Sequence, residues 1–253
     1  MDLDLKGRSV VVMGGSKGIG LACAQQFQQE GASVTICARS QASVDQGLAH
    51  LHNAVGVVAD VTDAQDLSRV FDCAEAAFGK VDVLVVNAGG PPAGPLDSLS
   101  DDQWRAAVDL TLMSAVRAAR LALPGMRERR WGRIVVISSF GVKQPAPNLS
   151  LSNSVRMAVL GWAKTLATQV AVDNVTVNTV CPGWTRTDRV TSLLADAADA
   201  AAMEASIVSA IPLGRIGDAD EIARLVVFLG SEAASYMTGT AIQVDGGIVQ
   251  GYA

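Results

Sequence analysis

Short runs of apolar, mostly β-branched residues alternate along the chain with longer stretches in which apolar residues recur at a helical period. Continuous apolar runs are typical of strands in a parallel sheet that is covered on both faces. They predict strands at residues 8–13, 33–38, 54–59, 81–86, 132–138, 175–180 and 241–245. The longer stretches predict helices at residues 18–30, 63–78, 101–124, 150–171 and 219–229.

Strand–helix alternation of this kind implies right-handed crossovers and helices on both faces of the sheet. We therefore predict an α/β fold with a doubly wound parallel sheet of about seven strands. Neither an internal repeat nor a linker divides residues 1–253, so we expect one domain. The Ala-rich segment 184–212 breaks the alternation. It predicts a helical insertion over a substrate cleft at the carboxyl ends of the strands, and a packing helix without substrate contact is the alternative.

Composition narrows the function classes. The chain is 49% hydrophobic and 18% charged, which favours a large buried core over disorder. Its net charge of −5 and the lack of a basic run argue against nucleic acid or an anionic membrane surface as partner. No apolar stretch is long enough for a membrane span or a secretion signal, so we expect a cytoplasmic protein. The scattered cysteines and only two histidines predict no metal site.

A glycine-rich turn joins the first predicted strand to the first predicted helix. The sequence GGSKGIG places Gly14, Gly18 and Gly20 at this junction, together with Ser16, Lys17 and Ile19. Such a turn lets the backbone approach a pyrophosphate, whose charge the helix N-terminus stabilises. The strand before it and the helix after it are the context that supports a dinucleotide site, and a tight turn without a ligand is the alternative.

The spacing G-x-x-x-G-x-G resembles the fingerprint of the short-chain dehydrogenase/reductase family, and the resemblance extends over almost the whole chain. The chain also resembles this family in the segment N-x-x-x-P-G-x-x-x-T, which begins at Asn178, and in its C-terminal third. The resemblance implies a Rossmann-type dinucleotide-binding domain in a branch near the β-ketoacyl carrier-protein reductases. Further cofactor contacts are then expected from Asp60, Val61, Asn87, Ala88, Gly89, Pro182, Gly183 and Thr187.

The end of the second predicted strand bears on the choice of cofactor. Arg39 stands there, where relatives that prefer NAD carry an acidic residue for the ribose 2′-hydroxyl. An arginine can instead pair with a 2′-phosphate through two hydrogen bonds, and Lys17 adds a second positive charge. We therefore expect NADP(H) to be preferred over NAD(H). A solvated surface cation is the alternative for each residue.

The catalytic residues that the resemblance implies are a Ser, a Tyr, a Lys and an Asn, and only Ser139 is present. Counting along the helical segment places Ser152 where the family has Tyr and Arg156 where it has Lys, while Thr111 stands in place of Asn. Residues four apart share a helix face, so we expect Ser152 and Arg156 both to face the nicotinamide. A serine hydroxyl is a much weaker acid than a tyrosine phenol, and Arg keeps its proton.

Two functions remain open at this stage. The first is an NADP(H)-dependent oxidoreductase that acts on a small carbonyl or alcohol with an altered site of Ser139, Ser152 and Arg156. The second is a dinucleotide-binding protein with little catalysis, such as a sensor or a partner subunit.

Lys143 could supply a proton if its loop folds inward, although a solvated loop lysine is the simpler interpretation. A non-redox dehalogenase on the same fold ranks last, and the resemblance also implies a homotetramer.

Overall fold

The computed structural model describes residues 2–195 and 197–251, and it places seven parallel strands in one twisted sheet. The strand order is β3-β2-β1-β4-β5-β6-β9, which reverses direction between β1 and β4. This confirms the Rossmann-type doubly wound fold. The strands are β1 (Ser9–Val12), β2 (Ser33–Ala38), β3 (Ala54–Val58), β4 (Val83–Val86), β5 (Gly132–Ile137), β6 (Val175–Pro182) and β9 (Ala241–Val244).

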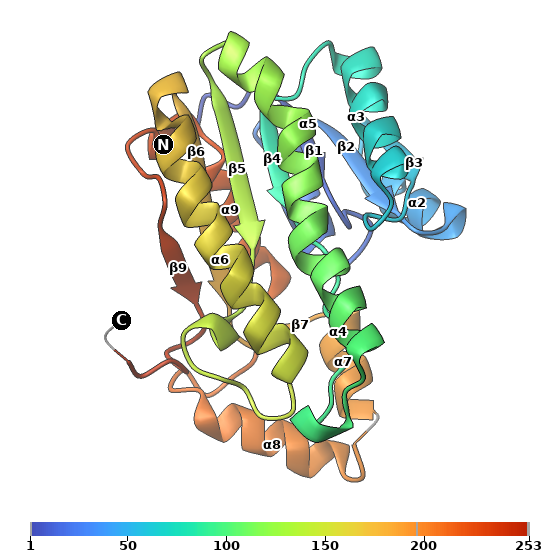
Figure 1. Ribbon diagram of the computed structural model, residues 1–253, viewed down its shortest axis with the longest axis vertical. Coiled ribbons are helices and arrows are strands. Elements are labelled where there is room, and N and C mark those ends of the chain that lie inside the picture. Colours follow the sequence, from blue (N-terminus) through green and yellow to red (C-terminus); the bar gives the residue numbers. More distant parts are fainter. Residues whose placement is uncertain (1, 196, 252–253) are drawn as a thin grey trace.

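Helices cover both faces of the sheet (Figure 1). One buried cluster joins the sheet to α3, α5 and α6, and a second cluster joins its other face to α1 and α9. The helices are α1 (Gly18–Gln29), α2 (Gln41–Leu48), α3 (Ala64–Phe78), α4 (Asp101–Val108), α5 (Ser114–Glu128), α6 (Ser150–Val170), α7 (Asp188–Ala195), α8 (Ala200–Ala210) and α9 (Ala219–Leu229). Short 3₁₀ turns occupy Leu96–Ser98, Phe140–Val142, Ala171–Asp173 and Glu232–Ala234.

Two features of the helices differ from the prediction. Helix α2 was not expected, because its sequence QASVDQGL carries few apolar residues; Ser40 caps it by accepting a hydrogen bond from the Ser43 N–H. The single helix predicted at 101–124 is α4, a π-helical segment at Asp109–Met113, and α5. Helix α5 also continues past Pro124 to Glu128. A π segment inside a helix often marks a functional region.

The Ala-rich segment 184–212 folds into α7 and α8, preceded by the short strand β7 (Thr185–Arg186). This strand pairs with β8 (Gly217–Asp218) outside the main sheet. Figure 1 shows α7 and α8 beyond the carboxyl ends of the strands. Helix α8 buries Ile207 against Phe140, in the turn after β5, and against Ile248 near the C-terminus. The segment therefore covers the end of the sheet where ligands bind in folds of this class.

Candidate active site

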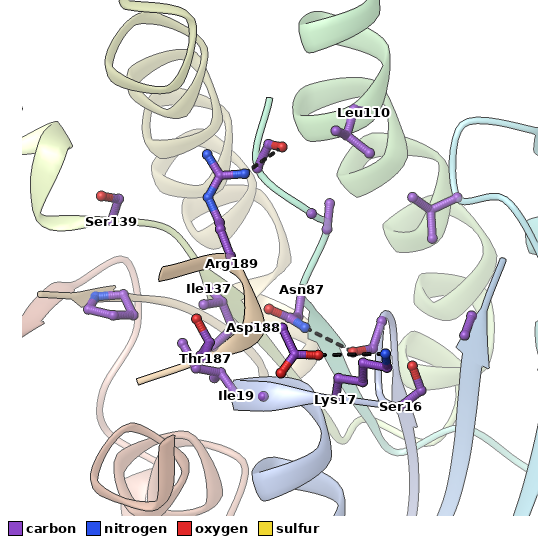
Figure 2. Close-up of a pocket in the computed structure, with 18 of the residues that line it drawn as sticks. Ser16, Lys17, Ile19, Asn87, Leu110, Ile137, Ser139, Thr187, Asp188 and Arg189 are labelled. Atoms are coloured by element: carbon purple, nitrogen blue, oxygen red, sulfur yellow. Dashed lines mark hydrogen bonds and ion pairs between the residues drawn. The ribbon is translucent and has the colours of Figure 1, made fainter. Parts of the chain in front are cut away.

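A cavity of ≈ 960 Å³ opens at the carboxyl ends of the central strands (Figure 2). Its walls come from the loops that follow the first six strands of the main sheet and from α7. Most residues predicted from the sequence line it: Gly14, Ser16, Lys17, Gly18, Ile19, Arg39, Asp60, Val61, Asn87, Ala88, Gly89, Ser139, Arg156, Pro182, Gly183 and Thr187. Gly20 and Ser152 lie close by but do not line it.

The glycine-rich turn has the backbone geometry that the motif predicts. Gly14 and Gly18 adopt φ values of +60° and +51°, which side chains with a Cβ rarely tolerate. A Cβ on Gly20 would lie 2.2 Å from the Gly14 carbonyl oxygen, so only glycine lets α1 approach the turn. No side chain caps the N-terminus of α1, at Lys17, and its first turn holds no acidic residue. These N–H groups fit a pyrophosphate, and the residues present therefore fit a dinucleotide cofactor.

Asn87, which follows β4, holds the glycine-rich turn in place. Its Nδ2 donates hydrogen bonds of 3.2 Å to the carbonyl oxygens of Met13 and Gly14 (Figure 2). A Cβ on Gly14 would stand 2.6 Å from the Asn87 carbonyl oxygen. The loops after β1 and β4 therefore touch through one amide and one glycine. This contact spans the reversal point of the sheet, where ligands bind in such folds.

Arg39, Asp60 and Lys17 are the residues predicted to contact the adenosine end of the cofactor. Arg39 is exposed at the end of β2. Asp60 follows β3, and its Oδ1 accepts hydrogen bonds from the N–H and the hydroxyl of Thr62. Lys17 forms an ion pair with Asp188, with 3.6 Å between Nζ and Oδ2. Because Lys17 and Asp188 are both well exposed, the pair contributes little to stability.

Ser139 follows β5 and presents a hydroxyl to the cavity (Figure 2). Its Oγ accepts a hydrogen bond of 3.1 Å from the N–H of Gly141, at the start of the turn Phe140–Val142. A hydroxyl that accepts one bond keeps its own proton available as a donor. Ser139 can therefore donate to an oxygen atom bound in the cavity.

Arg156 and Ser152 lie together on α6, as their spacing predicts. The Arg156 Nε donates to the Ser152 Oγ at 3.2 Å, and its Nη1 donates to the carbonyl oxygens of Ile137 and Ser138 at 2.9 and 3.1 Å. The guanidinium is thereby fixed against the end of β5, with Nη2 left to other acceptors. Ser152 itself is only 7% exposed. Ser152 does not line the cavity; it contacts Arg156, which does.

The pKa of the Arg156 guanidinium is shifted from its ordinary value. Burial, followed by the nearby positive charge of Arg189, lowers its pKa to about 10, and Cys181 acts in the opposite direction. The guanidinium therefore stays protonated at neutral pH. Because it is half-buried and poorly hydrated, its charge acts more strongly on a bound group than a surface charge would.

Arg189, in the first turn of α7, was not predicted as a site residue. It lines the cavity (Figure 2), and its Nη1 and Nη2 donate to the carbonyl oxygens of Gly90 and Pro91 at 2.8 and 2.9 Å. It is open to solvent on one side, yet the surrounding protein removes enough water to lower its pKa. Its position two residues after Thr187 was the only sequence signal, and no periodicity marks it.

Three other residues lie outside the cavity wall. Lys143 is half-buried, and its charge acts to lower the pKa of Cys181, which burial raises to about 11. Thr111 lies in the π segment, 4% exposed, with a hydroxyl that has no partner among the described residues. Asn178 ties β6 to the C-terminal segment: its Nδ2 donates to the Met237 carbonyl, and its Oδ1 accepts from the Thr240 hydroxyl.

A parallel sheet with a phosphate-binding turn at its first crossover defines a dinucleotide-binding protein. The family model described as enoyl-(acyl carrier protein) reductase matches residues 14–249. The chain belongs to this family, within the short-chain dehydrogenases/reductases. It is 34% identical to the 3-oxoacyl-[acyl-carrier-protein] reductase FabG of Haemophilus influenzae, over 96% of this chain and 99% of that protein.

Two solved structures have the same fold. L-sorbose reductase from Gluconobacter frateurii, complexed with NADPH and L-sorbose, is 33% identical with a TM-score of 0.93, covering 99% of this chain and 100% of that one. YwfH, an NADPH-dependent reductase involved in bacilysin biosynthesis, is 29% identical with a TM-score of 0.91, covering 96% and 99%. In residues 2–195 and 197–251, no helix is long and apolar enough to cross a membrane, and no cluster of metal-binding side chains occurs.

Proposed function

We propose that this protein is an NADP(H)-dependent reductase of a ketone, aldehyde or 3-oxoacyl thioester, with a non-standard site formed by Ser139, Ser152 and Arg156. The observation that carries the proposal is that the Ser139 hydroxyl, whose proton remains available as a donor, and the fixed cation of Arg156 line the same cavity as the phosphate-binding turn. Support for NADP(H) comes from Arg39 and from the two NADPH-dependent reductases with the same fold.

NADPH, when bound, supplies a hydride to the carbonyl carbon. Ser139 donates a hydrogen bond to the carbonyl oxygen, which gains negative charge as the C–H bond forms. Arg156 stabilises this charge, or holds the cofactor ribose, through the N–H groups that its bonds to the end of β5 leave available. Ser152 positions Arg156 by accepting from its Nε. The oxygen then takes a proton from water, because Arg156 stays protonated and a serine hydroxyl is a weak acid.

The alternative is a dinucleotide-binding protein with little catalysis. Its support is that Ser152, where the family resemblance implies a tyrosine, is almost fully buried and hydrogen-bonded to Arg156. A sensor or partner subunit would keep the cofactor contacts and lose the proton donor. The two functions differ in one measurable property, the dependence of NADPH oxidation on the hydroxyl of Ser139.

Stopped-flow NADPH oxidation with 3-oxoacyl thioesters, ketoses, diketones and aldehydes tests the proposal. With at least one compound we expect turnover that falls about a hundredfold or more in Ser139→Ala, as for loss of an oxyanion donor. Ser154→Ala is the control, because Ser154 is exposed on α6. NADPH that binds but is never oxidised by any compound would favour the alternative.

We also propose that the protein is a homotetramer packed through α4, α5, α6 and the C-terminus. Exposed apolar side chains on this side of the molecule, Val108 at the end of α4 and Met157 on α6, support the proposal. Sedimentation velocity at micromolar concentration tests it. A monomer under these conditions would contradict the tetramer.

A further inference from the structure

Two guanidinium groups, from Arg156 and Arg189, line one cavity at the site of the proposed reduction. We propose that the substrate carries an anionic group, a carboxylate or a phosphate monoester, near its carbonyl, and that Arg189 together with Arg156 binds this group. This inference rests on the proposed function and specifies its substrate class. It assigns Arg189 a role in substrate selection.

Arg189 is oriented for an anion. Its two hydrogen bonds to the carbonyl oxygens of Gly90 and Pro91 fix the plane of the guanidinium, and they leave its other N–H groups without an acceptor among the described residues. A Cβ on Gly90 would lie 2.3 Å from the Arg189 Cζ, so the guanidinium rests directly on the loop backbone. A planar, fixed fork of N–H donors matches the geometry of a carboxylate or phosphate.

Arg156 supplies the second cation. Its Nε and Nη1 bind Ser152 and the end of β5, so Nη2 remains for a ligand. Both arginines line the same cavity, and the positive charge of Arg189 is one of the causes that lower the pKa of Arg156. Two like charges that line one cavity repel each other, and a bound anion relieves this repulsion.

In the part of the chain that the structure describes, no carboxylate forms an ion pair with Arg156 or Arg189. Asp188, beside Arg189 in the sequence, pairs instead with Lys17. Asp245 accepts hydrogen bonds from the N–H groups of Gly247 and Val249. The cavity therefore keeps an excess of positive charge, although the chain as a whole has a net charge of −5.

The cofactor pyrophosphate is the other possible source of an anion. The uncapped N-terminus of α1 and the turn at Gly14 and Gly18 already offer N–H donors to it. The two arginines belong to different elements, the start of α7 and the middle of α6, and the bonds of Arg156 direct it to the end of β5 beside Ser139. We therefore assign them to the substrate, and the experiment separates the two sources.

The test compares anions with matched neutral compounds: short- and medium-chain 3-oxo acids with their methyl esters, and dihydroxyacetone phosphate with dihydroxyacetone. We expect the protein to favour an anion about tenfold or more in kcat/KM. In Arg189→Gln this preference should disappear through a higher KM for the anion, while the neutral compound changes less than about threefold and the Kd of NADPH stays constant. Arg189→Lys keeps the positive charge but not the planar fork of N–H donors, so its preference for the anion in kcat/KM should lie between those of wild type and Arg189→Gln.

Arg186→Gln is the matched control, because Arg186 lies three residues earlier and pairs with Glu204 outside the cavity. Calorimetric titration of the same compounds into the NADP⁺ complex gives a readout without turnover. An anion that binds wild-type protein and is lost in Arg189→Gln supports the inference even if no compound is reduced, in which case only the proposed reductase fails. The inference is wrong if wild-type protein binds the anion and the matched neutral compound equally well. It is also wrong if Arg189→Gln loses anion binding only because its affinity for NADPH is weaker.

Discussion

The Nε of Arg156 donates a hydrogen bond to the Oγ of Ser152, 3.2 Å away and one turn earlier on α6. The two residues therefore act as a pair, although only Arg156 lines the cavity. Because Ser152 is nearly buried, its hydroxyl positions the guanidinium more readily than it reaches a substrate. The arrangement combines a buried polar group with a fixed cation, which is typical of functional sites.

Removing the Ser152 hydroxyl tests this positioning role. In Ser152→Ala, Arg156 loses the acceptor of its Nε, and we expect kcat/KM to fall about tenfold, equivalent to about 1.4 kcal/mol. The Kd of NADPH should change less than about threefold if Arg156 acts mainly on the substrate oxygen. Ser154→Ala, at an exposed position of the same helix, should match wild type in both measurements. An unchanged kcat/KM in Ser152→Ala would remove Ser152 from the proposed site.

Gly20 and Gly161 form a matched pair of glycine substitutions. A Cβ on Gly20 would lie 2.2 Å from the Gly14 carbonyl oxygen, whereas one on Gly161 would meet nothing within 4 Å. We expect Gly20→Ala to raise the Kd of NADPH at least about tenfold and to lower the free energy of unfolding by about 1–3 kcal/mol. Gly161→Ala, exposed within α6, should raise that free energy by about 0.5–1 kcal/mol.

Urea unfolding and fluorescence titration with NADPH measure both effects. The two substitutions change the same atoms, so a difference between them reports the contact with Gly14 and not the chemistry of alanine. Normal NADPH binding by Gly20→Ala would mean that the turn does not hold the cofactor as proposed.

The sheet was predictable because its strands are short and rich in apolar, β-branched residues, and the central strands β1 and β4 are continuous buried apolar runs after Ser9. Helix α2 was missed because it is held at its start by the Ser40 cap and buries only two residues, Val44 and Gly47, of which only Val44 has a side chain. The π segment around Thr111 was also not predicted, since over a single turn the apolar pattern does not distinguish a π-helical hydrogen-bonding pattern from an α-helical one.

The site was predictable where chemistry follows chain order and not where it depends on tertiary contact. The glycine-rich turn and the pairing of Ser152 with Arg156 follow from local spacing. The tie between Asn87 and Gly14 joins loops far apart in the sequence, so the motif indicates the residue but not its partner. Arg189 carries no pattern at all, and only the fold brings it beside Arg156.

The pH dependence of the reaction should lack an ionisation near neutrality. Burial lowers the pKa of Arg156 to about 10, so its charged form persists below that pH and is lost above it. Burial raises the pKa of Cys181 to about 11, so its thiol stays neutral over the same range. We expect kcat/KM to be flat from about pH 6 to about pH 9 and to fall above about pH 10.

The same shift has a defined sign for stability. The pKa of Arg156 is lower in the folded protein than the ordinary value of an arginine, so burial of the charge opposes folding at all pH values below about 10. This cost is relieved only as the pH rises from about 10 towards the ordinary pKa of an arginine, and it adds no pH dependence to stability near neutrality. The pH profile of kcat/KM is measured from initial rates with saturating NADPH. An inflection in kcat/KM between about pH 6 and pH 9 would indicate a proton donor other than water.

Replacing Arg39 with Asp should reverse the cofactor preference. Arg39 is exposed at the end of β2 and lines the cavity, where its guanidinium can pair with a 2′-phosphate. In Arg39→Asp the carboxylate repels that phosphate, and we expect the Kd of NADPH to rise about ten- to hundredfold. The Kd of NADH should fall, because the carboxylate can accept a hydrogen bond from the free 2′-hydroxyl.

Lys6→Asp is the control, since it makes the same change in net charge at an exposed position before β1. Raising the salt concentration should reduce the effect of Arg39→Asp only partly, because a direct hydrogen-bonded pair is screened less than a distant charge. A change in the NADPH to NADH ratio that is equal in the two variants would mean that Arg39 acts through the general field of the protein. A larger change in Arg39→Asp alone would establish contact with the 2′-phosphate as the basis of selection.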